Sequence, residues 1–130
     1  MALHPLAQAR LDKLGFISLD QYYDSKIWSD FRNLIAQRYR EHGKWYCWAC
    51  KRQGKRFDLH HVRYNNFACF NTAEIKDIRI LCKPCHSGLH ALMKRRGMTL
   101  REATEYVMAG ELLKEQKPVS IITRITPTIA

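Results

Sequence analysis

The sequence lacks any long apolar run. No stretch approaches the roughly 20 apolar residues that a membrane-spanning helix needs, because Lys, Arg or His interrupts each candidate. The first ten residues also lack a basic segment followed by an apolar one, so a secretory signal peptide is not expected. Internal repeats and low-complexity linkers are missing too. We therefore expect a cytoplasmic protein with reduced thiols, and the odd number of cysteines, five, agrees with this.

Acidic residues are few. There are 12 Asp and Glu against 22 Lys and Arg, which gives a formal charge of +10 with His neutral. The excess is greatest in residues 41–90, which hold 9 basic and 4 acidic side chains, all five cysteines and five of the six histidines. This balance predicts a polyanionic partner, nucleic acid first and an acidic membrane surface second. The alternative is a solvated basic surface with no particular ligand.

The 130 residues, 46% of them hydrophobic, predict one domain with a core of its own and an α+β fold. Apolar side chains recur with helical spacing over 27–39, and Gly43 is placed to end that helix. Local signals predict further helices after Ser18 and Asn71 and over 84–97 and 99–110. They also predict a strand over 57–62, and a strand or an extended lead-in to the second cysteine pair over 78–81. We also expect an irregular start, short strands around a Gly-centred turn in 44–56, and an added strand or a disordered end after residue 118.

Four of the cysteines form two pairs with the same spacing. Each pair has two residues between its cysteines, and 31 residues separate the pairs, which are Cys47 with Cys50 and Cys82 with Cys85. Such turns direct both sulfurs at one ion, and two of them complete a closed tetrahedral site, so we predict a structural zinc. The alternatives are two redox dithiols or unrelated buried thiols. Cys69 is left without a role.

The histidines form a second cluster interleaved with the first. His86 and His90 are four residues apart on a predicted helix and therefore face the same side, where they can share a metal ion. His60 and His61 are adjacent on a predicted strand and point to opposite faces, so one is expected to bind that ion and the other to act differently. The alternative for each histidine, taken singly, is that it lies on the surface, or in the core with its hydrogen bonds made, and binds no metal.

The order C-x-x-C, His-His, Asn, then Leu-Cys-x-x-Cys-His-x-x-x-His resembles the HNH endonucleases of the His-Me finger class, especially small phage and bacterial members. The resemblance covers about residues 25–97. It implies a ββα-metal core on a zinc-ribbon frame with flanking helices, and metal-dependent hydrolysis of DNA phosphodiester bonds. With this core over 25–97, the expected domain plan has an arm over 1–24, a helical extension over 98–117 and a tail over 118–130.

The same resemblance assigns roles to single residues. His61 resembles the general base, and His60, His86 and His90 resemble the ligands of a catalytic divalent ion, Mg²⁺ or Mn²⁺ with Zn²⁺ or Ni²⁺ as alternatives. The motif asparagine is best matched by Asn71, although Asn65 and Asn66 also fit, and Asn71 can instead be a helix N-cap because Glu74 follows three residues later.

The implied partner is double-stranded DNA, in the cytoplasm of a bacterial or phage-infected cell. Basic residues near the core can contact its phosphates, and these are Lys51, Arg52, Lys55, Arg56, Arg63 and Lys83. Two alternatives to an autonomous nuclease stay open at this point. One is a non-catalytic zinc module that binds nucleic acid, and the other is an accessory subunit of a phage packaging or restriction complex.

Overall fold

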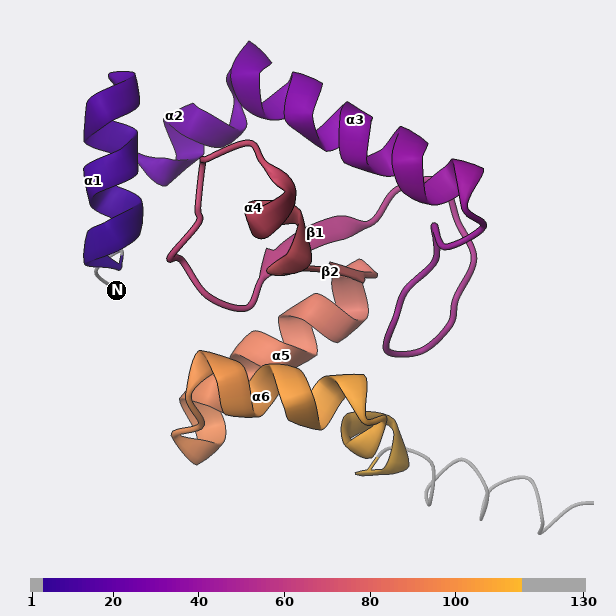
Figure 1. The fold of residues 1–130 in the computed structure, drawn as a ribbon. Coiled ribbons are helices and arrows are strands. Elements are labelled where there is room, and N and C mark those ends of the chain that lie inside the picture. Colours follow the sequence, from indigo (N-terminus) through magenta and orange to yellow (C-terminus); the bar gives the residue numbers. More distant parts are fainter. Residues whose placement is uncertain (1–3, 116–130) are drawn as a thin grey trace, which may run out of the picture.

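The computed structural model describes residues 4–115 of the chain, and Figure 1 shows its helices around one small sheet. The elements in chain order are α1 (Pro5–Leu14), α2 (Leu19–Tyr23), α3 (Lys26–Glu41), β1 (Asp58–His61), α4 (Thr72–Lys76), β2 (Ile78–Leu81), α5 (Lys83–Arg96) and α6 (Leu100–Met108). The expected α+β class is confirmed, with most of the described residues helical. None of the helices in this described part combines the length and the apolar character needed to cross a membrane.

Helix α1 contradicts the expected irregular start. It begins with Pro5 in its first turn and ends at Gly15, whose φ of 88° is left-handed. Only Ala7 and Leu11, one turn apart, are buried on it. A helix that buries two side chains needs few regularly spaced apolar residues, so helical spacing alone does not predict this one.

Helix α3 confirms the strongest periodic signal in the chain. Trp28, Phe31 and Ile35 are buried along one face, and Gly43 follows the helix with a φ of 68°. The predicted short helix after Ser18 is also present as α2, because the Ser18 hydroxyl accepts a hydrogen bond from the N–H of Gln21. Aromatic side chains of these two helices pack together, with Tyr22 5.7 Å and Tyr23 5.0 Å from Trp28 between ring centroids.

Between Gly43 and β1 the structure has no strand, contrary to the short strands expected there. The segment instead forms a tight turn around the first cysteine pair. The N–H of Lys51 donates to the Cys47 carbonyl at 2.8 Å, and the N–H of Trp48 donates to the Ile80 carbonyl on β2 at 2.8 Å. Because these backbone groups are already hydrogen-bonded within the turn or to β2, they are not available to form a separate pair of strands.

Strands β1 and β2 confirm the two predicted strands and form an antiparallel pair. His60 lies opposite Arg79, and His61 lies opposite Ile78. Successive side chains of a strand point to opposite faces. Figure 1 shows α3 and α4 on one side of the sheet and α5 and α6 on the other. The two neighbouring histidines therefore enter two different environments.

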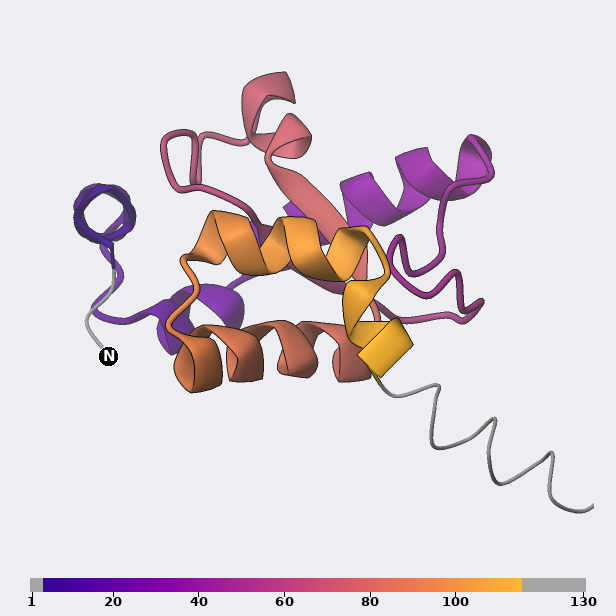
Figure 2. The ribbon, with the colours of Figure 1, turned by 90° about the horizontal axis from the view of Figure 1, so that it is seen from below.

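The remaining helices begin at the residues that the local signals predicted. The Asn71 side chain caps α4, Pro84 lies in the first turn of α5, and Thr99 and Glu102 form a capping box on α6. Figure 2 shows α5 and α6 side by side as a helical hairpin, with the left-handed Gly97 ending α5. The expectation for the tail after residue 118 lies outside the described residues.

Candidate functional site

The structure brings the two cysteine pairs together. Their sulfurs lie within 4.8 Å of one another, and the set is Cys47, Cys50, Cys82 and Cys85. The first pair lies in the loop after α3, while the second pair lies at the N-terminal end of α5. Four converging sulfurs can hold a metal such as zinc, which confirms the predicted cluster. Cys69 lies elsewhere, and its Sγ accepts a hydrogen bond from the Arg10 guanidinium at 2.7 Å.

The surroundings of the clustered thiols favour a bound cation. Burial alone would raise the pKa of the Cys47 thiol, but backbone N–H donors, led by that of Cys50, lower it to about 7. In the same cluster burial raises the pKa of the Cys85 thiol. Neighbouring thiolates repel one another, so the four sulfurs can ionise together only with a positive ion among them. The arrangement is thus suited to a closed structural metal site.

The structure also brings three histidines together. His60 comes from β1, and His86 and His90 come from successive turns of α5. One ring nitrogen from each lies within 4.8 Å of the others, and the Nε2 atoms of His86 and His90 are 3.1 Å apart. His60 is 3% exposed, whereas His90 is open to solvent. The cluster therefore has a buried side against the sheet and an accessible side.

Two residues outside the cluster hold its rings. Thr104 on α6 lies with its Oγ1 2.9 Å from Nε2 of His60, and Asp58 on β1 accepts from Nδ1 of His86 at 3.0 Å. Burial, followed by the charges of His86 and His90, lowers the pKa of His60 to about 3. A neutral imidazole keeps a lone pair for a metal ion. His60 is thus held ready to bind a cation throughout the physiological pH range.

His61 lies on the opposite face of β1, away from this cluster. Its side chain is 2% exposed, and its Nε2 is 2.8 Å from a carboxylate oxygen of Glu74, a fully buried residue on α4. The rings of Trp28 and Phe67 pack around it at centroid distances of 6.4 and 5.0 Å. The predicted general base is therefore a member of a buried imidazole–carboxylate pair.

The candidate motif asparagines have defined structural partners. Asn71 Oδ1 accepts the N–H of Glu74 at 3.0 Å, which is the N-cap alternative, and Asn66 Nδ2 donates to Asp77 at 3.0 Å. Asn65 is exposed. The cap helps to fix the position of Glu74, and Glu74 in turn contacts the ring of His61. A direct catalytic role for Asn71 stays a prediction.

Exposed basic side chains lie on the same loop as the first cysteine pair. All six predicted DNA-contacting residues are exposed: Lys51, Arg52, Lys55, Arg56, Arg63 and Lys83. Four of the six lie on the loop between α3 and β1, which also carries the first cysteine pair. Exposed cations beside a candidate metal site can hold the phosphates of a nucleic acid.

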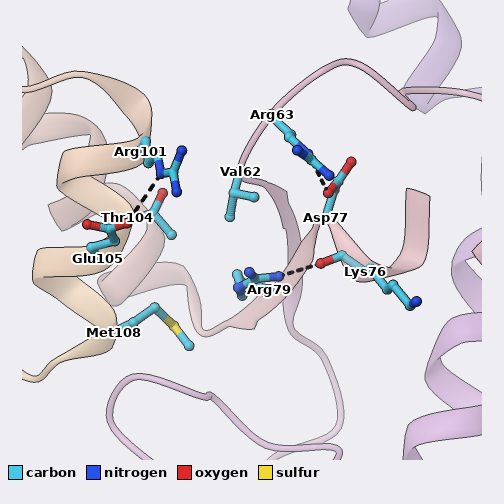
Figure 3. A pocket seen from close by; sticks show the side chains of 9 residues that line it. All are labelled: Val62, Arg63, Lys76, Asp77, Arg79, Arg101, Thr104, Glu105 and Met108. Atoms are coloured by element: carbon cyan, nitrogen blue, oxygen red, sulfur yellow. Dashed lines mark hydrogen bonds and ion pairs between the residues drawn. The ribbon is translucent and has the colours of Figure 1, made fainter. Parts of the chain in front are cut away.

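A pocket of about 490 Å³ lies between α6 and the sheet (Figure 3). Three arginines line it, namely Arg63, Arg79 and Arg101. Arg63 is paired with Asp77 at 2.8 Å, and Arg79 donates to a backbone carbonyl at 2.7 Å. Thr104 lines the pocket and also contacts His60, so this basic pocket adjoins the histidine cluster.

No family model, curated protein or solved structure matches the chain. Function must therefore be inferred from the chemistry of the two clusters and from the charge around them. The residues that carry this chemistry are the four cysteines, the three clustered histidines and the buried His61–Glu74 pair.

Several residues of the site were not found from the sequence. Glu74 carried one signal, its position three residues after the cap Asn71, but that signal indicated only a helix start. Thr104 gave none, because a threonine inside a helix has no feature that marks a contact to a histidine 44 residues away. Arg79 and Arg101 could be recognised as pocket residues only once α6 was placed against β2.

Proposed function

We propose that the protein is a metal-dependent endonuclease of the HNH type that hydrolyses DNA phosphodiester bonds. The observation that carries this proposal is the convergence of His60, His86 and His90 beside a four-cysteine cluster. A ββα-metal core consists of two antiparallel strands followed by a helix, and the order of the antiparallel strands β1 and β2 followed by α5 supports this proposal, as does the four-cysteine cluster. An excess of ten positive charges supports a nucleic-acid substrate.

The donor set bears on which ion the histidine cluster takes. Imidazole nitrogens suit zinc, nickel and iron, whereas magnesium prefers carboxylate and phosphate oxygens. Among the candidate ions we therefore favour Zn²⁺ or Ni²⁺ over Mg²⁺ and Mn²⁺ for His60, His86 and His90. When bound, such an ion supplies positive charge to the scissile phosphate and to the departing 3′-oxygen.

His61 is proposed as the general base. Glu74 occupies its Nε2 and is itself held by the N–H groups of Ala68 and Phe70 at 2.9 and 2.8 Å, so the imidazole orientation is fixed. Nδ1 is then the nitrogen that can take a proton from water, and the carboxylate stabilises the imidazolium that forms. The side chain is only 2% exposed and lies on the face of β1 opposite the histidine cluster, so this role requires a rearrangement that brings Nδ1 within reach of water at the scissile phosphate.

The burial of His61 also favours a second function. A histidine enclosed by aromatic rings and paired with a buried carboxylate can serve the core alone. In that case the protein is a non-catalytic zinc module that binds nucleic acid, or an accessory subunit that works with a partner. Cleavage by the isolated chain separates these possibilities from the nuclease.

The test is a plasmid-nicking assay with His61→Gln across a series of divalent metals. Glutamine can still donate a hydrogen bond to Glu74, so the core stays satisfied, but it cannot act as a base near neutral pH. We expect the nicking rate to fall about 100-fold or more while the melting temperature and DNA affinity stay close to wild type.

The control variant is His42→Gln, at the exposed C-terminal end of α3, which should nick as the wild type does. Equal nicking by wild type and His61→Gln would contradict the catalytic role of His61. Tight DNA binding by the wild type without cleavage under any metal would instead establish the binding module.

The basic pocket gives a separate prediction for DNA binding. Arg101 extends from α6 with its side chain 85% exposed and is paired with Glu105 at 3.3 Å, so Arg101→Ala removes one positive charge from the pocket without disturbing the core. We expect the slope of log K against log salt concentration to decrease in magnitude by about 0.9. Fluorescence anisotropy with a short duplex, in the His61→Gln background, measures this. Arg38→Ala removes the same charge from α3 and should leave the slope unchanged; equal effects of both variants would exclude a specific role for the pocket.

A further inference from the structure

Helix α6 lies outside the segment that resembles a nuclease, yet one of its side chains contacts the histidine cluster. Thr104 is 4% exposed, one turn into the helix that Thr99 caps. Its Oγ1 lies 2.9 Å from Nε2 of His60. A buried contact between a hydroxyl and an imidazole can run in either direction, so the remaining partners of each group decide which atom donates.

The hydroxyl of Thr104 has a second acceptor within reach. This is the carbonyl oxygen of Leu100, one turn earlier in α6, at 2.7 Å from Oγ1. A hydroxyl carries one hydrogen, so when Thr104 donates it to Leu100, Oγ1 accepts from His60. Nε2 of His60 then carries the N–H. In a neutral imidazole the other nitrogen, Nδ1, then keeps its lone pair.

His86 is oriented in the same manner. The carboxylate of Asp58 has no hydrogen to give, so Nδ1 of His86 donates to it across 3.0 Å. The lone pair of His86 is therefore on Nε2, the atom that lies 3.1 Å from Nε2 of His90. Thr104 and Asp58 thus each leave one unprotonated nitrogen, on His60 and His86 respectively.

We propose that Thr104 is a positioning residue that holds His60 in its Nε2–H form and so presents Nδ1 to a metal ion shared with His86 and His90. The inference rests on the proposed function only in requiring that this cluster binds metal. It assigns to α6 a part in the metal site that the segment 25–97 does not contain. Loss of such an outer partner typically weakens metal binding by about 10–100-fold.

Thr104→Val and Thr104→Ser form a matched pair. Valine keeps the shape of threonine but removes the acceptor, whereas serine keeps the hydroxyl and loses one methyl group. The protein is first loaded with one equivalent of zinc to fill the cysteine cluster, and Co²⁺ is then titrated while its visible absorption is recorded. We expect Thr104→Val to weaken Co²⁺ binding by about 10–100-fold and Thr104→Ser to stay within about threefold of wild type.

Wild-type affinity in a folded Thr104→Val would overturn the proposal, as would equal weakening in both variants. A second measurement needs no variant: long-range ¹H–¹⁵N spectra of the zinc-loaded wild type report which nitrogen of each histidine carries its hydrogen. The Nε2–H form of His60 supports the proposal, and the Nδ1–H form overturns it. Neither experiment uses DNA, so a protein that passes both but never cleaves would contradict the nuclease and leave the role of Thr104 intact.

Discussion

A Cys47→Ser variant is expected to contain no zinc and to show no cooperative unfolding transition. Cys47 is fully buried and supplies one of four converging sulfurs. A metal there would connect the loop after α3 to the start of α5, and within residues 4–115 the sheet between them consists of two strands of four residues each. Zinc binding in small domains is worth about 10–16 kcal/mol, which exceeds or equals the whole stability of many domains. Metal analysis and thermal unfolding followed by circular dichroism measure both effects.

The fifth cysteine supplies the control. Cys69→Ser changes the same chemistry outside the cluster and keeps an acceptor for Arg10, so it should retain about one zinc and the wild-type melting temperature. Chelation of the wild-type protein should reproduce the Cys47→Ser result. A zinc-free Cys47→Ser that melts cooperatively near the wild-type temperature would show that the cysteines do not need a metal to hold the fold.

His90→Ala is expected to abolish DNA cleavage and leave the fold intact. His90 is exposed, and its one hydrogen-bond partner in the described part of the chain is His86, so its removal should change the stability by no more than about 0.5 kcal/mol. The loss of an outer partner weakens a metal site by about 10–100-fold, so the loss of a ligand should lower the nicking rate by at least about 100-fold.

The nicking rate and the binding of Co²⁺ after the cysteine cluster has been filled should fall together in His90→Ala. His42→Ala is the matched control, because His42 is exposed at the end of α3 and its ring contacts the Arg38 carbonyl, away from both clusters. Cleavage by His90→Ala at the wild-type rate, with any metal, would remove the histidine cluster from the reaction and leave the proposed function without its main support.

Elements with local signals could be predicted from the sequence. The apolar stripe of α3, the Asn71 cap of α4 and the Thr99 capping box of α6 each specify a helix from neighbouring residues alone. The paired cysteine spacing likewise predicted a cluster that forms between distant segments. In that case the chemistry of a shared ion, rather than local conformation, is what makes the pattern recognisable.

The contacts that orient the site could not be predicted in the same way. Glu74 reaches His61 across the buried face of the sheet, and Thr104 reaches His60 from a helix that begins 40 residues after it. Both contacts depend on which face of β1 meets which helix, and this is decided by packing. The alternation along β1 predicted that the two histidines separate, but it could not say which partner each would meet.

Helix α5 contributes residues to both clusters within its first two turns. Cys82 is its N-cap, Cys85 and His86 are consecutive, and His90 follows one turn later. A metal bound by the cysteines therefore sets the rotation of the helix about its own axis, and this rotation decides where the two imidazoles point. One residue inserted after Cys85 would turn His86 and His90 by about 100°. The spacing along α5 therefore couples the two clusters, and a version transplanted to another protein would have to include both.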